Sequence, residues 1–223
     1  MAIKMETIAV FEQFDVRKVK LMTLPALNKA SVLVPLFVRS GKLYTLMTQR
    51  SKQLRTSGGE VCFPGGKKDP CDKDEVDTAL REAQEEIGVH PGDVHVICTL
   101  HPIISKNNLL VTPVVGFIEE SFRPSPNPAE VSAAFTVPLD VFAFNKDHFD
   151  GLAAAQAAVP SLSFDYVDPD TGAKYHIWGL TAMIAFIVAT IAHKTKPEFD
   201  MGFNAEELQG MLRRHLHKRL SKL

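Results

Sequence analysis

Three glutamates, Glu82, Glu85 and Glu86, stand within five residues of one another in a segment with a helical pattern. On a helix these spacings place them along one flank, where like charges repel by about a few tenths of a kcal/mol per pair. They also fall in the last turns, where the helix dipole disfavours an anion by about 0.3–1 kcal/mol. Arg81 can neutralise only one of them, so the cluster indicates a bound cation.

A glycine turn precedes these acids. Pro64 is followed by Gly65 and Gly66, which have no side chains and therefore let the backbone approach a ligand closely. Carboxylate and carbonyl oxygens suit hard divalent cations, and Mg²⁺ commonly shares phosphate oxygens with its substrate. The combination predicts metal-assisted attack of water on a phosphate or diphosphate. The alternative is an ordinary solvated acidic helix after a glycine turn.

A helix over 74–87 is the element that would position the three acids. An apolar stripe at helical spacing marks its buried side, and it consists of Val76, Leu80, Ala83 and Ile87. Acidic residues occupy the first turn, where the helix dipole favours them. Gly88 follows the stripe and is a natural C-cap, so the helix is predicted to end there.

Strand and helix patterns alternate along the rest of the chain. Apolar and alternating runs predict strands at Val32–Arg39, Leu43–Gln49, Val94–His101, Leu110–Ile118, Leu162–Val167 and Lys174–Trp178. A short Ser-Gly turn joins the first two strands and the turn Asp168–Gly172 joins the last two, which predicts two hairpins. Further helices are expected at Leu180–Ala192 and Ala205–Arg219. The mixture predicts an α/β or α+β fold in one domain.

Composition excludes several classes of protein. The chain has 223 residues, 25 Lys and Arg against 26 Asp and Glu, and 45% apolar residues, so nucleic-acid binding through bulk basicity is not expected. Three cysteines without CxxC spacing support neither a disulfide framework nor a structural zinc site. The longest apolar run, Ile177–Ala192, is too short and interrupted to predict a membrane span. The first residues mix both charges, so no secretory signal is expected.

The acidic segment resembles the Nudix box of Nudix hydrolases. The chain reads Gly66, five residues, Asp72, eight residues, Arg81-Glu82, then Glu85-Glu86 and Gly88. Two departures from the usual box are an aspartate at the early acidic position and a spacer of eight residues before Arg81 instead of seven. They put a direct metal role for Asp72 in doubt and leave the helix glutamates in register. The resemblance implies a Nudix fold, with a mixed β-sheet sandwiched between helices.

Two further stretches are similar to the coenzyme A diphosphatase branch of that family. They are Gln49–Arg55 followed by Gly59–Lys67, with an RSxxLR…GxVxFPGG pattern, and Ile177–Ala182. The branch implies hydrolysis of coenzyme A and acyl-CoA esters at the diphosphate, giving 3′,5′-ADP and (acyl-)4′-phosphopantetheine. Alternatives are a Nudix hydrolase for another nucleoside diphosphate derivative, such as ADP-ribose, and a non-catalytic nucleotide-binding module.

The resemblance also implies roles for individual residues. Glu82 and Glu86 are the expected principal ligands of Mg²⁺ or Mn²⁺, and Glu85 is expected as a third ligand or as the activator of water. Arg81 is expected to orient these acids by charge-assisted hydrogen bonds. Glu130, after the proline-rich loop, is the leading candidate for a general base outside the box, and a solvated loop acid is the alternative.

Positive side chains near the box are candidates for substrate binding. Arg50 and Arg55 are expected to grip phosphates, because a guanidinium binds phosphate in bidentate fashion, while a surface salt bridge is the alternative. Lys67 is expected to neutralise the diphosphate or to remain solvated.

The ends of the chain lead to expectations about organisation and location. Residues 1–30 are expected to form a helical extension, 31–195 the Nudix domain, and 196–223 a C-terminal helix. The last three residues, Ser221, Lys222 and Leu223, match a peroxisomal targeting tripeptide. A location in the peroxisomal matrix and recognition by the import receptor are therefore expected.

Overall fold

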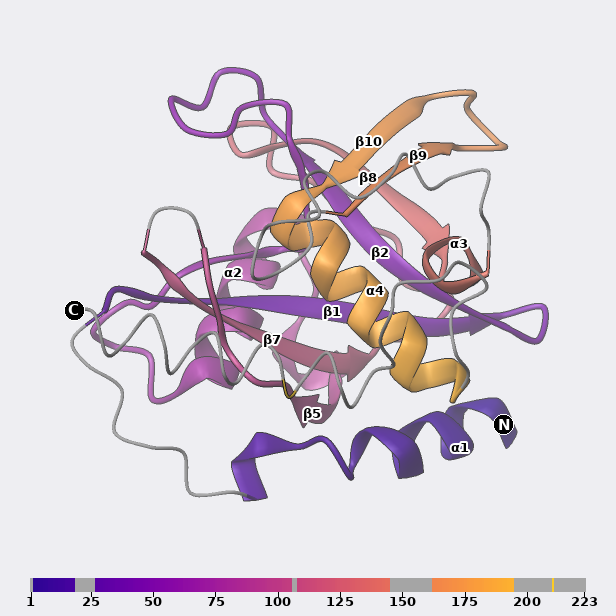
Figure 1. Cartoon of the computed structure of the whole chain (residues 1–223). Coiled ribbons are helices and arrows are strands. Elements are labelled where there is room, and N and C mark those ends of the chain that lie inside the picture. Colours follow the sequence, from indigo (N-terminus) through magenta and orange to yellow (C-terminus); the bar gives the residue numbers. More distant parts are fainter. Residues whose placement is uncertain (1, 19–26, 106–107, 145–161, 195–209, 211–223) are drawn as a thin grey trace.

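A computed structural model describes residues 2–18, 27–105, 108–144, 162–194 and 210. Figure 1 shows their arrangement. The helices are α1 (Ala2–Phe11), η1 (Val16–Lys18), α2 (Glu75–Ile87), η2 (Pro91–Asp93), α3 (Asp140–Ala143) and α4 (Gly179–His193). The strands are β1 (Lys29–Arg39), β2 (Lys42–Arg50), β3 (Val61–Cys62), β4 (Gly65–Lys67), β5 (His95–Thr99), β6 (Ile103–Ile104), β7 (Leu110–Phe117), β8 (Val131–Pro138), β9 (Ser163–Val167) and β10 (Lys174–Trp178).

A mixed sheet runs through the centre of the described part of the chain. Its main path is β3-β2-β1-β7-β5, with β8 beside β2, β4 beside β1 and β6 beside β7. β1 and β7 are parallel, with Val34 opposite Val115, whereas β1 and β2 form an antiparallel hairpin. β9 and β10 form a separate hairpin, so both predicted hairpins are confirmed.

Helices cover both faces of the central sheet (Figure 1). On one face α2 packs against buried residues of β1 and β7 such as Leu33 and Val114. On the other face α4 and α1 enclose a larger apolar cluster that includes Phe11, Met47 and Phe186. Burial of both faces is typical of a sheet that contains parallel strands. The predicted fold, a mixed sheet between helices, is confirmed.

The predicted helix over 74–87 is confirmed as α2, with both of its ends fixed by local chemistry. Asp74 is the N-cap, and its Oδ1 accepts a hydrogen bond of 2.9 Å from the N–H of Asp77. At the other end Gly88 adopts φ of +75°, and its N–H donates to the carbonyl of Gln84. Ala83 and Ile87 are fully buried, Glu86 beside them is buried as well, and Glu85 is exposed on the flank that faces solvent.

Some expectations lie partly or wholly outside the described residues. The predicted helix at Ala205–Arg219, except for its residue 210, and the terminal tripeptide are among them. The boundaries near residues 30 and 195 stay predictions, although α1 is a helix within the predicted N-terminal extension. Across the described ranges, none of the helices combines the length and apolarity needed to cross a bilayer.

Candidate active site

The glycine turn lies directly against the last turns of α2. β4 pairs with β1 so that Gly66 is opposite Ser31, which fixes the turn on the sheet. The N–H of Gly65 donates a 3.1 Å hydrogen bond to Oε2 of Glu86. Any side chain at Gly66 would overlap the carboxylate of Glu82. Gly65 is required because its φ is +157° and a Cβ there would overlap the backbone of Ser31 and Val32, whereas a Cβ at Gly66 would displace the carboxylate of Glu82.

Three glutamates share one electrostatic environment. Glu86 is only 3% exposed, and burial, together with the charges of Glu82 and Glu130, raises its pKa to about 7. Burial also raises the pKa of Glu82, and the charges of Glu85 and Glu130 add to that effect. Glu130 comes from the loop before β8, and because its charge acts on both Glu82 and Glu86, the structure brings it near these two glutamates of α2. Such crowding of negative charge is what a divalent cation relieves.

Arg81 ties this region together through four partners. Its Nε and Nη2 bind the buried carboxylate of Asp72 at 2.8 and 3.0 Å, and Nη2 also donates to the carbonyl of Lys67. Nη2 lies 3.0 Å from Oε1 of Glu82, and Nη1 lies 3.1 Å from Oε2 of Glu85. The expectation that Arg81 neutralises only one helix glutamate was therefore wrong, because a guanidinium offers five N–H donors in a planar fork.

Asp72 is the residue whose role was not read from the sequence. Its contact with Arg81 holds the pKa of the Asp72 carboxyl well below its usual range. The nine-residue separation from Arg81 does not reveal this pair, since the intervening turn brings the two together. Asp72 thus supports the guanidinium that orients Glu82 and Glu85.

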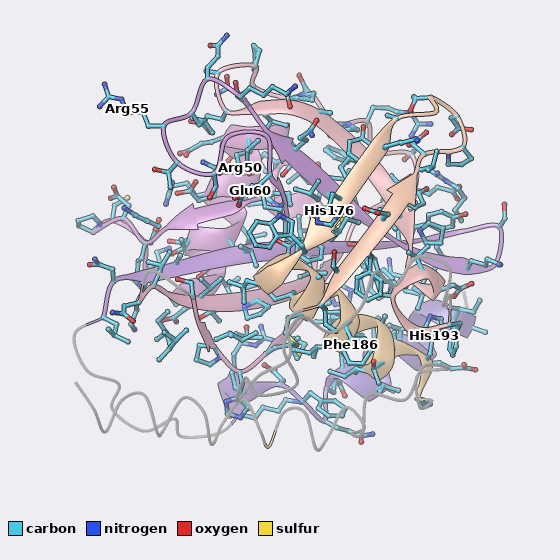
Figure 2. The ribbon with its side chains drawn as sticks, turned by 45° about the horizontal axis from the view of Figure 1, so that its top comes forward. Arg50, Arg55, Glu60, His176, Phe186 and His193 are labelled. Atoms are coloured by element: carbon cyan, nitrogen blue, oxygen red, sulfur yellow. The ribbon has the colours of Figure 1, made fainter. Side chains whose placement is uncertain are left out.

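Arg50 approaches the carboxylates from the end of β2. Its Nη1 lies 4.0 Å from Oε1 of Glu86, while its buried Nε has no hydrogen-bond partner. The N–H of Ser51 donates to the carbonyl of Glu130, which fixes the loop that carries this acid beside β2. Figure 2 shows Arg50 next to Glu60, whose carbonyl accepts from the N–H of Arg50. Arg50 is thus placed with Glu86 and Glu130.

Two predicted substrate-binding residues are not gathered with this group. Arg55 is exposed on the loop between β2 and β3, and Figure 2 shows it at the outer end of that loop, away from Arg50. Lys67 is exposed at the end of β4, and only its carbonyl contacts Arg81.

The donor set fits a hard divalent cation. Glu82 and Glu86 offer carboxylate oxygens on one helix flank, and the absence of side chains at Gly65 and Gly66 leaves the backbone close to them. In the described ranges no three His, Cys, Asp or Glu side chains already converge as a metal cluster. In this structure the positive charge nearest to Glu86 comes from Arg50, and the positive charge nearest to Glu82 comes from Arg81.

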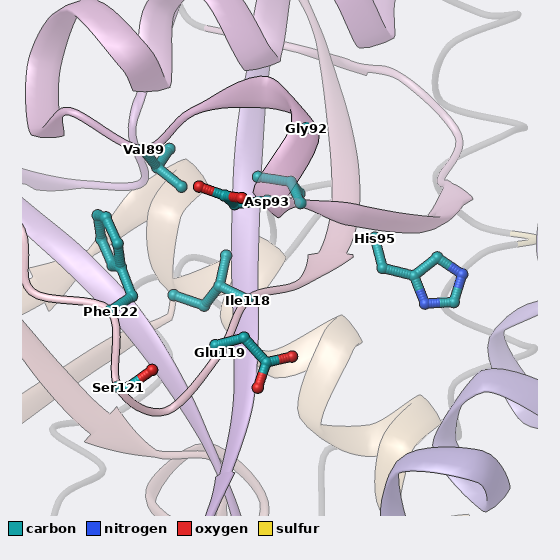
Figure 3. Close-up of a pocket in the computed structure, with 9 residues that line it drawn as sticks. Val89, Gly92, Asp93, His95, Ile118, Glu119, Ser121 and Phe122 are labelled. Carbon is teal, nitrogen blue, oxygen red and sulfur yellow. The ribbon is translucent and has the colours of Figure 1, made fainter.

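A pocket of about 730 Å³ lies elsewhere, beyond the end of α2. Figure 3 shows Val89, Asp93, Ile118 and Phe122 among its lining residues, which come from η2 and the segments around β5 and β7. None of the predicted site residues lines it. The carboxylate site is therefore distinct from this pocket.

Comparison with known proteins identifies the family. The NUDIX domain pattern matches residues 27–155, more than half of the chain, and includes α2 with its three glutamates. The chain belongs to the Nudix hydrolase family. The predicted family membership is thus confirmed, and the matched box is the segment that builds the site described above.

Individual relatives are similar to this Nudix hydrolase. The mouse protein named peroxisomal coenzyme A diphosphatase NUDT7 is 46% identical over 182 residues, which cover 81% of this chain and 77% of that protein. Nudix hydrolase 15, mitochondrial, of Arabidopsis thaliana is 42% identical over 77% of this chain, and the match spans only 61% of the plant protein. A crystal structure of an Ap4A hydrolase from C. elegans is 21% identical, with a TM-score of 0.43 over 51% of this chain and 81% of that one.

Proposed function

We propose that this Nudix hydrolase cleaves the diphosphate of coenzyme A and acyl-CoA esters, giving 3′,5′-ADP and (acyl-)4′-phosphopantetheine. The observation that carries the proposal is the group of Glu82, Glu86 and Glu130 against the Gly65-Gly66 turn, in a chain 46% identical to a mouse coenzyme A diphosphatase. Carboxylates that repel one another beside an accessible backbone suit a cation-assisted phosphate reaction.

Glu82 and Glu86 are the proposed ligands of Mg²⁺ or Mn²⁺, with Glu85 as a third. A bound divalent ion supplies a Lewis acid for the diphosphate and lowers the pKa of water. Arg81 holds the carboxylates of Glu82 and Glu85 in place, and the N–H of Gly65 holds that of Glu86. These contacts preorganise the acids on a rigid helix, which is the condition for precise positioning.

Glu130 is the proposed general base, with Glu85 as the alternative. The charge of Glu130 acts on both Glu82 and Glu86, which supports a place at the reacting centre. The side chain of Glu85 is 53% exposed, and its Oε2 lies 3.1 Å from Nη1 of Arg81, so Arg81 already occupies one of its oxygens.

Arg50 is the proposed phosphate-binding residue of the site. Its buried Nε has no partner, and its Nη1 is held near Glu86, so a phosphate oxygen at this place would satisfy a donor. Arg55 and Lys67 are proposed to act at the periphery, because both side chains are exposed.

Product analysis tests the proposed reaction. The purified chain with coenzyme A and Mg²⁺ is expected to release 3′,5′-ADP, and the same preparation with ADP-ribose is expected to turn over with a lower kcat/KM. Chelation of the metal with EDTA is expected to stop both reactions. Absence of 3′,5′-ADP from an intact, metal-supplied preparation would rule out the proposed activity.

We infer a peroxisomal location from the terminal Ser221-Lys222-Leu223 and from the name of the mouse relative. The Arabidopsis relative is named as mitochondrial, so the location requires its own test. A tagged chain without Leu223 is expected to lose peroxisomal import, since the tripeptide is read by a receptor. An unchanged distribution would contradict the inference.

A further inference from the structure

The loop that carries Glu130 is fastened to the end of α2. The last carbonyls of a helix have no partner within it, so they need donors from elsewhere. Here the N–H of Asn127 donates a 2.9 Å hydrogen bond to the carbonyl of Glu86, and the N–H of Ser125 donates one of 2.9 Å to that of Ile87. The backbone of Glu86 is therefore bound by the same loop that supplies the proposed base.

Asn127 begins the tight turn that ends at Glu130. The carbonyl of Asn127 accepts hydrogen bonds from the N–H of Glu130 at 3.0 Å and from that of Val131 at 2.8 Å. Its side-chain Oδ1 accepts another, of 3.2 Å, from the N–H of Ala129 inside the turn. Asparagine favours turns because its side chain binds the backbone two residues further on, and Pro128 presets the backbone of the following position. Asn127 therefore closes the turn with both its backbone and its side chain.

The backbone of Glu130 is thereby held from two sides. Its N–H binds Asn127, which in turn binds Glu86, so a single residue links the backbone of the proposed base to that of a proposed metal ligand. Its carbonyl accepts a 2.8 Å hydrogen bond from the N–H of Ser51, the residue after Arg50. Two segments that carry site residues, the end of α2 and the end of β2, thus meet at Glu130.

We propose that Asn127 is the positioning residue of the general base, an inference that rests on the proposed function and on the proposed role of Glu130. A general base works within hydrogen-bond reach of the water whose proton it removes, at about 2.6–3.2 Å. A displacement of about 1 Å can lower the rate by about 100-fold. Asn127 contacts neither that water nor the metal, and it acts on the reaction by holding the turn that presents Glu130.

Steady-state kinetics with coenzyme A and Mg²⁺ test this role. Asn127→Ala removes the side-chain bond to Ala129 and is expected to lower kcat by about 10-fold with KM nearly unchanged, because a loosened turn misplaces the base and not the substrate. Asn127→Ser is expected to recover most of kcat, since a hydroxyl caps such turns more weakly. Ser121→Ala, elsewhere in the segment between β7 and β8, is the control and is expected to change neither constant. An unchanged kcat in Asn127→Ala, or a loss confined to KM, would overturn the proposal.

A double-mutant cycle shows whether Asn127 acts through Glu130. Glu130→Gln is expected to lower kcat by about 100-fold or more, as the loss of a general base does. In that background Asn127→Ala is expected to lower kcat no further, because the group that Asn127 positions is already gone. A further loss of about 10-fold in the double variant would overturn the proposal, since Asn127 would then act independently of Glu130. A wild-type kcat in Glu130→Gln would overturn it as well and leave Glu85 as the base.

Amide hydrogen exchange reports on the turn independently of activity. The N–H of Glu130 is expected to exchange faster in Asn127→Ala than in the wild-type chain, while that of Val34, fully buried in β1, is expected to stay equally protected and so to show an intact fold. Equal exchange of Glu130 in both chains would overturn the proposal. If the wild-type chain fails to cleave coenzyme A, the proposed function is rejected, whereas the exchange of Glu130 still decides whether Asn127 holds the turn.

Discussion

Glu86 combines burial with crowding by like charge. The side chain is nearly inaccessible, receives one backbone hydrogen bond from Gly65 and faces Arg50 only at 4.0 Å. These favourable contacts do not offset burial and the charges of Glu82 and Glu130, so its pKa rises to about 7. A carboxylate held in this state gains more from a divalent cation than one already neutralised by a close ion pair.

Glu86→Gln is expected to lower metal-dependent kcat/KM by more than about 100-fold, because it removes a proposed ligand while preserving size and polarity. The fold is expected to persist, as shown by an unchanged circular dichroism spectrum. Glu75→Gln, in the first turn of the same helix, is the matched control and is expected to retain activity. Retained turnover in Glu86→Gln would refute its assignment as a ligand.

The raised pKa of Glu86 also predicts how stability varies with pH. A glutamate that titrates near 4.5 in the unfolded chain and near 7 in the folded one binds more protons when folded, so its contribution to stability is present below pH 4.5. That contribution is lost as pH rises through 7.

Denaturant unfolding in EDTA at pH 6 and pH 8 measures this effect. The free energy of unfolding of the wild-type chain, minus that of Glu86→Gln, is expected to fall between these two values. The difference isolates Glu86 from other groups, such as His193, whose pKa is lowered by burial and whose effect has the opposite sign. An equal difference at both pH values would show that Glu86 has an ordinary pKa.

At the scale of elements, α2 and the turn before it act as one unit. The N-cap of Asp74 and the C-cap of Gly88 set the ends of the helix, while Arg81 joins its middle to Asp72 and to the carbonyl of Lys67. The site therefore depends on the contacts of Arg81 that join the turn to the helix, as well as on the acids themselves.

Arg81→Ala is expected to reduce the free energy of unfolding by about 3–5 kcal/mol, because it leaves the buried carboxylate of Asp72 without its partner. Activity is expected to fall as well, since Glu82 and Glu85 lose their common contact. Asp74→Ala removes only the N-cap and is expected to cost about 1 kcal/mol with activity retained. If the free energy of unfolding falls no more in Arg81→Ala than in Asp74→Ala, Arg81 does not join the turn to the helix in the way described.

At the scale of the whole molecule, the described first part of the predicted N-terminal extension packs into the core. Phe11 of α1 is fully buried in the cluster that also contains α4. Asp15 then accepts hydrogen bonds from Arg17 and from the N–H of Thr99, which fastens the segment after α1 to β5. α1 and the segment with Asp15 and Arg17 are therefore fastened to the sheet.

Phe11→Ala is expected to destabilise the chain by about 3–5 kcal/mol through the cavity that it creates. The site lies on other elements, so kcat at a temperature where the variant is folded is expected to match the wild-type value. Thermal melting and initial-rate assays measure the two effects. A change in stability below about 1 kcal/mol would show that α1 contributes little to the core.

The sequence predicted those elements whose signals are local. The bounds of α2 follow from an acidic first turn, an apolar stripe and a glycine that lie within fifteen residues of one another, and the two hairpins follow from short turns. β3 and β4 were missed because two- and three-residue strands have no periodicity, and their pairing is set by distant β2 and β1.

The residues of the candidate site also fall into those that local spacing reveals and those that tertiary packing brings together. The three glutamates of α2 were recognisable from spacing, whereas the nearness of Glu130 to Glu86 depends on a backbone hydrogen bond between Ser51 and Glu130. The support of Arg81 by Asp72 likewise arises from the path of the turn. Contacts between residues far apart in the chain depend on tertiary packing, which no local pattern encodes.

The central claim is that the carboxylates of Glu82 and Glu86 together hold a divalent cation. Anomalous diffraction from crystals soaked in Mn²⁺ tests it most directly. The account predicts a single strong peak between these two side chains, at bonding distance from oxygens of both. An anomalous peak elsewhere would contradict the account. So would the absence of any peak at saturating Mn²⁺ while the carboxylate of Glu82 still pairs with Arg81.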